Sequence, residues 1–130
     1  FQVTLDLYPG NPDLLNGLAE RYFLSGMNQK AKELYESVIL LKPVSPDQSF
    51  VNLSEIYFDE NEIEKAKEVL KVCLTYWPYS PEAHDKLAGI YFREKNQPYA
   101  KYHIEKAIAY NPASPVYQSH YEQIMKKKQN

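Results

Sequence analysis

Four copies of one short proline motif divide the chain at nearly equal intervals. The motif has the form P-x-[NS]-P, uses eight of the nine prolines, and stands at residues 9–12, 43–46, 78–81 and 112–115. The first prolines of successive copies are 34, 35 and 34 residues apart. A fixed period in this range is typical of solenoid proteins, which repeat one supersecondary unit. The motif therefore predicts a repeat architecture within a single domain of 130 residues.

Each copy of the motif can end one helix and begin the next. Pro78 ends the preceding helix because proline lacks the backbone N–H that a helix interior needs. Ser80 is kept out of the α region by the proline after it, as an N-cap requires, and Pro81 suits the first helical position. Ser45 and Gln48 have the spacing of a capping box. We expect a helix to begin directly after each motif.

Between the motifs, apolar side chains form two helical stripes separated by a break. In residues 13–42 these side chains recur at three- and four-residue spacing on both sides of Gly26. Glycine at this place suits the left-handed residue just past a helix end. Asn61 and Lys95 mark the corresponding breaks in the next two segments. Each segment is therefore predicted to be a hairpin of two helices, each of about 14 residues.

The residues of these stripes resemble the tetratricopeptide repeat family over nearly the whole chain. The family pattern has a bulky residue, Leu with a small residue, and Tyr, followed by Ala, an aromatic or aliphatic residue, a small residue and Pro. The resemblance implies an all-α fold, in which antiparallel helix pairs form a right-handed superhelix, or α-solenoid. The matching residues are Leu15, Leu18, Ala19, Tyr22, Ala31, Tyr35, Val38 and Pro43 in the first repeat, Phe50, Leu53, Ser54, Tyr57, Ala66, Leu70, Cys73 and Pro78 in the second, and His84, Leu87, Ala88, Tyr91, Ala100, Ile104, Ala107 and Pro112 in the third.

The repeats are expected to form one continuous array. Glu122 stands where the earlier repeats have a small residue, so the last helix is expected to be a polar cap. The chain begins without Met, and we expect it to be a piece of a longer protein, which leaves its compartment open. The array over residues 1–130 divides into the tail of a preceding repeat at 1–10, repeats at 11–44, 45–79 and 80–113, and a capping helix at 114–130.

Composition argues against several classes of function. The net charge of −2 gives no overall attraction to nucleic acid or anionic membranes, and no apolar run approaches the roughly 18 residues that a membrane span needs. Cys73 is the only cysteine and is expected to be a buried, inert thiol. No two histidines have metal-ligand spacing on a helix, and neither a phosphate loop nor a catalytic triad is present. We therefore expect no enzyme activity, cofactor or metal.

The family resemblance also implies a concave face lined by the first helix of each hairpin. The three repeats place six carboxylates on this face, against the cations Lys86 and Arg93, and a phenylalanine follows each packing tyrosine. We predict a groove that binds a partner peptide or protein, with phenylalanines as anchors and carboxylates that select Lys or Arg. The predicted site residues are Asn16, Glu20, Phe23, Asn52, Glu55, Phe58, Asp59, Asp85, Lys86, Phe92 and Arg93.

Some members of the family clamp the carboxylate of a chaperone tail, but this chain departs from that pattern. Asn52 and Lys86 match two of the clamp positions. Asn16 and Glu20 stand where Lys and Asn are needed, and Glu82 stands where a second Lys is needed. Two carboxylates facing an anionic tail would repel it, so we expect no clamp.

Two other functions stay open from the sequence. The chain could self-associate through the incomplete first hairpin, whose apolar residues Phe1, Val3, Leu5 and Leu7 would lack their normal partner. It could also be a regulatory domain attached to an enzyme. RNA binding, which related helical repeats show, is not expected because the acidic face would repel phosphate.

Overall fold

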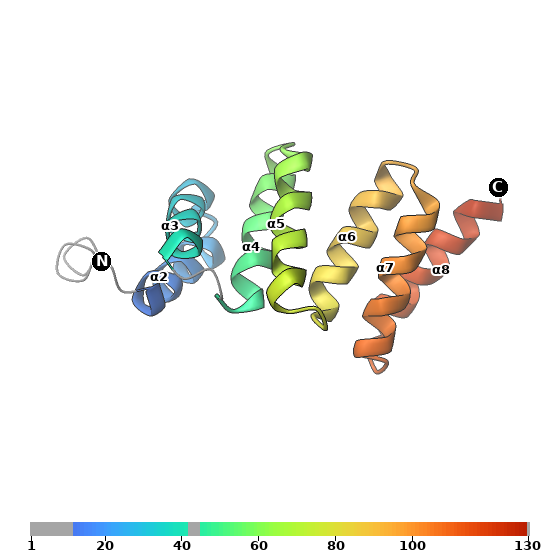
Figure 1. The fold of residues 1–130 in the computed structure, drawn as a ribbon. Helices are drawn as coiled ribbons and strands as arrows, with labels where there is room; N and C mark the ends of the chain where they lie inside the picture. The colour runs from blue at the N-terminus through green and yellow to red at the C-terminus, as the bar shows by residue number, and fades with distance from the viewer. Residues whose placement is uncertain (1–11, 42–44, 130) are drawn as a thin grey trace.

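The computed structural model describes residues 12–41 and 45–129, and these residues form seven α-helices and no strand. The helices follow one another along a single direction, with α2 and α8 at opposite ends (Figure 1). The predicted all-α fold, a right-handed superhelix of antiparallel helix pairs, is confirmed. The predicted tail at residues 1–10 lies outside the described residues. The helices are α2 (Pro12–Leu24), α3 (Asn28–Leu41), α4 (Asp47–Asp59), α5 (Ile63–Tyr76), α6 (Pro81–Arg93), α7 (Gln97–Tyr110) and α8 (Pro115–Gln129).

The proline motifs begin the helices in two different ways. Ser80 is the N-cap of α6 as predicted, since its hydroxyl accepts a hydrogen bond from the Ala83 backbone N–H at 3.3 Å. In α4 the N-cap is Pro46, so Ser45 is not the cap that a capping box requires and that prediction is wrong. The single extra residue of the 35-residue interval places Pro46 before the helix. Ser45 is instead buried, and its carbonyl accepts a hydrogen bond from the Trp77 indole at 2.7 Å.

All three hairpins turn in the same way. Gly26, Asn61 and Lys95 adopt left-handed backbone conformations with φ of 81°, 63° and 63°. Glycine adopts this conformation freely, whereas an L side chain at the same place is strained. The backbone N–H groups at each turn bond back to carbonyls of the last helical turn, as in a Schellman motif. These bonds join Met27 to Tyr22 at 2.9 Å, Glu62 to Tyr57 at 2.8 Å and Asn96 to Tyr91 at 2.8 Å.

Small residues allow the two helices of each hairpin to pack closely. The helices of one hairpin contact each other more extensively than they contact any other hairpin. Tyr57 and Tyr91 are buried, and Tyr22 is partly buried against the same core. The rings therefore fill the space between neighbouring hairpins, as the sequence predicts. The small buried residues are Ala19, Ala31, Ser54, Ala66, Ala88 and Ala100.

A repeated ion pair joins consecutive hairpins at their turns. Lys32 on α3 is 2.8 Å from Glu60, and Lys67 on α5 is 2.9 Å from Glu94. The hydrogen bond to the carboxylate is the largest effect on each lysine and raises its pKa. Both lysine side chains are mostly covered, so each pair fixes the second helix of one hairpin against the turn of the next.

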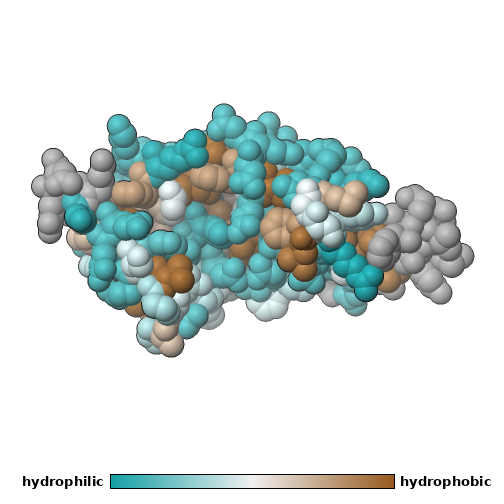
Figure 2. Space-filling view, turned by 180° about the vertical axis from the view of Figure 1, so that it is seen from behind, coloured by the Kyte–Doolittle hydropathy of each residue, from teal (hydrophilic) through white to brown (hydrophobic). Residues whose placement is uncertain are grey.

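The first helices of the hairpins form one continuous face. Contacts join α2 to α4, α4 to α6 and α6 to α8. Figure 2 views the molecule from behind and shows hydrophobic residues in separate patches within a mostly hydrophilic surface. A binding site on this array must therefore be local, because no single apolar strip runs along the whole molecule in that view.

Candidate functional site

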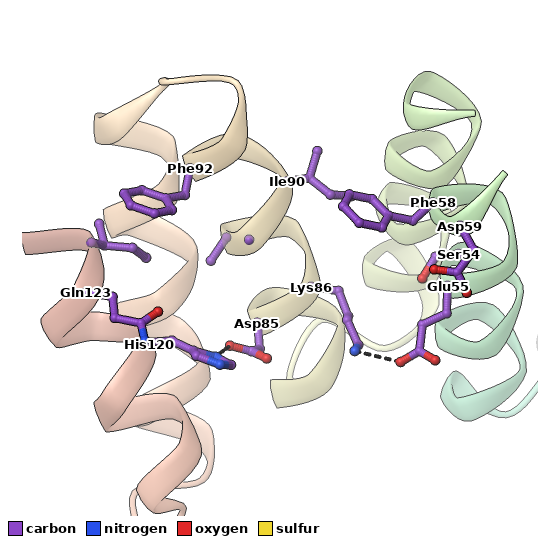
Figure 3. A pocket seen from close by; sticks show the side chains of 13 residues that line it. Ser54, Glu55, Phe58, Asp59, Asp85, Lys86, Ile90, Phe92, His120 and Gln123 are labelled. Atoms are coloured by element: carbon purple, nitrogen blue, oxygen red, sulfur yellow. Dashed lines mark hydrogen bonds and ion pairs between the residues drawn. The ribbon is translucent and has the colours of Figure 1, made fainter. Parts of the chain in front are cut away.

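A groove of about 420 Å³ opens between α4, α6 and α8 (Figure 3). Phe58 on α4 and Phe92 on α6 supply aromatic side chains, and the buried Ile90 and Ile124 lie beneath them. Gly89 on α6 is exposed in the groove, and a Cβ added there would meet no heavy atom within 4 Å. The groove therefore has an apolar floor with space for a ligand side chain.

The rim of the groove is polar and mainly acidic. Lys86 Nζ lies 2.6 Å from Glu55 Oε1 and joins α6 to α4 (Figure 3). His120 Nδ1 lies 2.7 Å from Asp85 Oδ1 and joins α8 to α6. Asp59 is exposed and forms no ion pair within the described part of the chain. Three carboxylates thus face one lysine and one histidine.

Electrostatic repulsion extends beyond the groove along α6. Desolvation raises the pKa of Glu82, and Lys86 opposes this effect. The carboxylates of Asp47, Glu55 and Asp85 raise the pKa further. The face formed by α4 and α6 therefore keeps an excess of negative charge, which favours a cationic ligand.

Six of the eleven predicted site residues line this groove: Glu55, Phe58, Asp59, Asp85, Lys86 and Phe92. Arg93 lies beside it, with its guanidinium 5.1 Å from the centre of the Phe58 ring. The two predicted cations of this face, Lys86 and Arg93, therefore both rest on α4 side chains.

Four predicted residues lie outside the groove, toward α2. Asn52 is buried, and its amide donates to the Tyr35 hydroxyl at 2.9 Å and accepts from Gln48 at 2.8 Å. Asn16 accepts a hydrogen bond from the buried Ser49 at 2.6 Å. These asparagines stabilise the contacts between helices. Glu20 is exposed and Phe23 is partly buried, both on α2.

Sequence reasoning missed the two isoleucines of the groove floor. Ile90 precedes the packing residue Tyr91, and Ile124 occupies the same place in the last repeat unit, 34 residues on. Ile56 stands 34 residues before Ile90 and is also buried. This isoleucine period was a usable signal. The prediction considered one face of each first helix, whereas the floor lies where consecutive first helices meet.

The histidines on α6 and α7 have a structural role away from the groove. His84 is buried, and its Nδ1 lies 3.0 Å from His103 Nδ1. Its Nε2 lies 3.0 Å from the carbonyl of Pro78, so Nε2 donates and Nδ1 accepts when the ring is neutral. Burial lowers the pKa of both rings, that of His103 to about 4, with the charge of the other histidine adding to the effect there. The pair is therefore neutral at physiological pH.

The described residues offer little for other chemistry. Cys73 is fully buried, and burial, with a smaller effect of Asp47, raises the pKa of its thiol to about 12. Within the described ranges, no three His, Cys, Asp or Glu side chains are grouped as a metal site would need. No helix in the described part of the chain combines the length and apolar character needed to cross a membrane.

Comparison with known proteins supports the family resemblance. Residues 47–76, which span the second hairpin, match a family model described as a tetratricopeptide repeat. The chain has the tetratricopeptide repeat fold. Comparison with curated protein sequences gives no match.

Several solved structures superpose on this tetratricopeptide repeat array at low sequence identity. MamA aligns with a TM-score of 0.88 and 20% identity, over 98% of this chain and 74% of MamA. The first such domain of Spaghetti (RPAP3), bound to an HSP90 peptide, aligns with a TM-score of 0.84 and 15% identity, over 92% and 94% of the two chains. The Yersinia enterocolitica type III secretion chaperone SycD, in complex with a peptide of the translocator YopD, aligns with a TM-score of 0.79 and 16% identity, over 89% and 93%.

Proposed function

We propose that this chain is a protein–protein interaction module, part of a scaffold or adaptor, that holds a segment of a partner in the groove between α4, α6 and α8. The observation that carries the proposal is the groove itself, with an apolar floor and a charged rim built by three consecutive first helices. Two proteins of the same fold have been solved with bound peptides, which supports a peptide as the ligand. Binding of this kind needs no catalytic group or cofactor.

The charges of the groove favour a partner with Lys or Arg. Three carboxylates line it against one lysine, and Asp59 has no ion-pair partner within the described residues. An acidic chaperone tail is a poor ligand for the same reason. Asn52, the asparagine that matches the clamp pattern, is also buried in a hydrogen bond to Tyr35. Nucleic acid is disfavoured because its phosphates would face these carboxylates.

A variant at Gly89 tests the groove directly. Gly89→Leu places a side chain in the groove, and the space above Gly89 allows it without a clash. Replacing a glycine inside a helix also removes a penalty of about 0.5–1 kcal/mol, so the variant should fold at least as stably as the natural chain. Gly17→Leu is the matched control, since Gly17 is exposed on α2 and has equally open surroundings.

The readout is capture of partners from a cell extract by the natural chain and by both variants, followed by measurement of affinity with each purified partner. We expect Gly89→Leu to lose partners that the natural chain and Gly17→Leu retain. Partners bound equally by all three proteins would place the binding surface elsewhere. Asp59→Lys tests the charge preference, and binding that is unaffected by this reversal argues against a basic ligand.

Self-association and attachment to an enzyme have no support in the described residues. The half-hairpin expected at residues 1–10 lies outside them, and no described contact indicates a second copy. Sedimentation at high protein concentration tests the first of these alternatives, and a concentration-dependent dimer would revive it.

A further inference from the structure

We propose that Lys86 and Arg93 are internal competitors that hold the groove in the absence of ligand. In this inference the ligand carries a large apolar side chain close to a Lys or Arg. The apolar side chain enters the space above Gly89, and the ligand cation takes the place of Lys86 at Glu55. The inference rests on the proposed function and specifies both the ligand chemistry and the regulation of the same groove.

Lys86 occupies a position that suits a ligand cation. It reaches from α6 across the groove to Glu55 on α4, with 2.6 Å between Nζ and Oε1 (Figure 3). The side chains are 37% and 39% exposed, so both remain partly hydrated. An exposed pair of this kind is easily exchanged, because a released lysine regains its hydration. A ligand cation can therefore replace Lys86 without leaving a buried charge unpaired.

Arg93 covers the aromatic wall in a similar way. Its guanidinium lies 5.1 Å from the centre of the Phe58 ring, and Arg93 itself is exposed. A ligand Arg could form the same cation–π contact once Arg93 moves into solvent. Both cations on this face thus rest on groups that a basic ligand would use.

The apolar part of the groove explains why a cation alone is not the expected ligand. Exchange of one surface cation for another gains little free energy. The floor formed by Ile90 and Ile124, with Phe58 and Phe92 beside it, can instead remove a ligand side chain from water. Burial of an apolar side chain supplies the net gain, and Asp59 adds attraction for the neighbouring cation.

Short synthetic peptides and NMR spectroscopy test this ligand chemistry. The probes are peptides with one Leu and one Lys, placed two, three or four positions apart so that both can share one face of a strand or helix. The chain has four glycines, so the Gly89 amide can serve as a groove reporter with Gly17 and Gly26 as references. We expect at least one Leu–Lys peptide to shift Gly89 alone. Peptides with Glu for Lys or Ser for Leu should have little effect.

A charge-neutralising variant tests the competition. Lys86→Met should bind the Leu–Lys peptide about two- to fivefold more tightly, the range expected for one exposed ion pair. Lys71→Met makes the same charge change on α5 outside the groove and should leave the affinity unchanged. In Glu55→Gln the advantage of Lys86→Met should disappear, since ligand and lysine no longer compete for that carboxylate.

Each outcome decides between the two proposals. Unchanged or weaker binding by Lys86→Met overturns the competition. A Gly89 shift with Leu–Glu peptides, or none with any Leu–Lys peptide at about 1 mM, overturns the ligand chemistry. Partners that Gly89→Leu still fails to bind would support the proposed function in that case. A peptide that binds the natural chain and Gly89→Leu equally overturns both.

Discussion

Acidification should destabilise the fold through the pair formed by His84 and His103. Both rings have a pKa below the ordinary value of 6.5, that of His103 at about 4. The unfolded chain therefore takes up protons first as the pH falls. The stabilisation is complete above about pH 6.5 and is lost as the pH falls toward 4, where folded His103 itself binds a proton.

The size of this effect follows from the geometry and the pKa of His103. Each pKa unit corresponds to about 1.4 kcal/mol, so a fall from 6.5 to about 4 has an upper limit of roughly 3 kcal/mol. Because His103 keeps some contact with water, we expect roughly 2 kcal/mol between pH 7 and pH 4.5. A loss of this size is a large fraction of the 5–15 kcal/mol that is typical of folded domains.

Urea unfolding at a series of pH values measures the effect. His103→Gln keeps a donor for His84 Nδ1 but removes one titrating ring, so its free energy of unfolding should depend much less on pH in this range. His120→Gln is the matched control, because it removes a histidine outside the pair. A natural chain whose stability is flat from pH 7 to about 4.5, or a His103→Gln variant with an unchanged slope, would refute the reasoning.

Three further predictions concern the packing and the turns. Leu53→Ala should cost roughly 2–5 kcal/mol in urea unfolding because Leu53 is 2% exposed, whereas Leu24→Ala, at a site 76% exposed, should cost less than about 0.5 kcal/mol. Equal costs would contradict the packing role of Leu53. Lys95→Gly should raise the free energy of unfolding by about 0.5–1 kcal/mol, since it relieves a left-handed lysine, and a thermal melt at lower temperature would disprove this. The Cys73 thiol should react with a disulfide reagent only after unfolding, and rapid reaction of the folded chain would show that it is accessible.

The local parts of the fold could be predicted because the sequence repeats them. The proline motif contains its own helix stop and helix start, and Gly26 signals a turn by its chemistry alone. The positions of Asn61 and Lys95 then follow from the period, and both adopt the same backbone conformation as Gly26. The error at Ser45 arose where the period lengthens by one residue, because a cap depends on the position at which the helix begins.

The candidate site was less accessible to sequence reasoning. Glu55, Phe58 and Lys86 could be assigned to one face from helical spacing. That spacing does not show that Lys86 pairs with Glu55, or that Asn52 turns inward to Tyr35. Such choices depend on distances between helices that lie 30 or more residues apart in sequence, so only the packed structure determines which side chains remain available to a ligand.

The ion pairs Lys32–Glu60 and Lys67–Glu94 occur once per junction and at equivalent places in the repeat. Any change in ionic strength that loosens them acts on each junction in the same sense. Small changes in the angle between neighbouring hairpins then add along the axis, so the pitch of the superhelix and the distance between its ends respond more strongly as hairpins are added. A longer array built from this unit would behave as an extensible spring whose stiffness depends on salt.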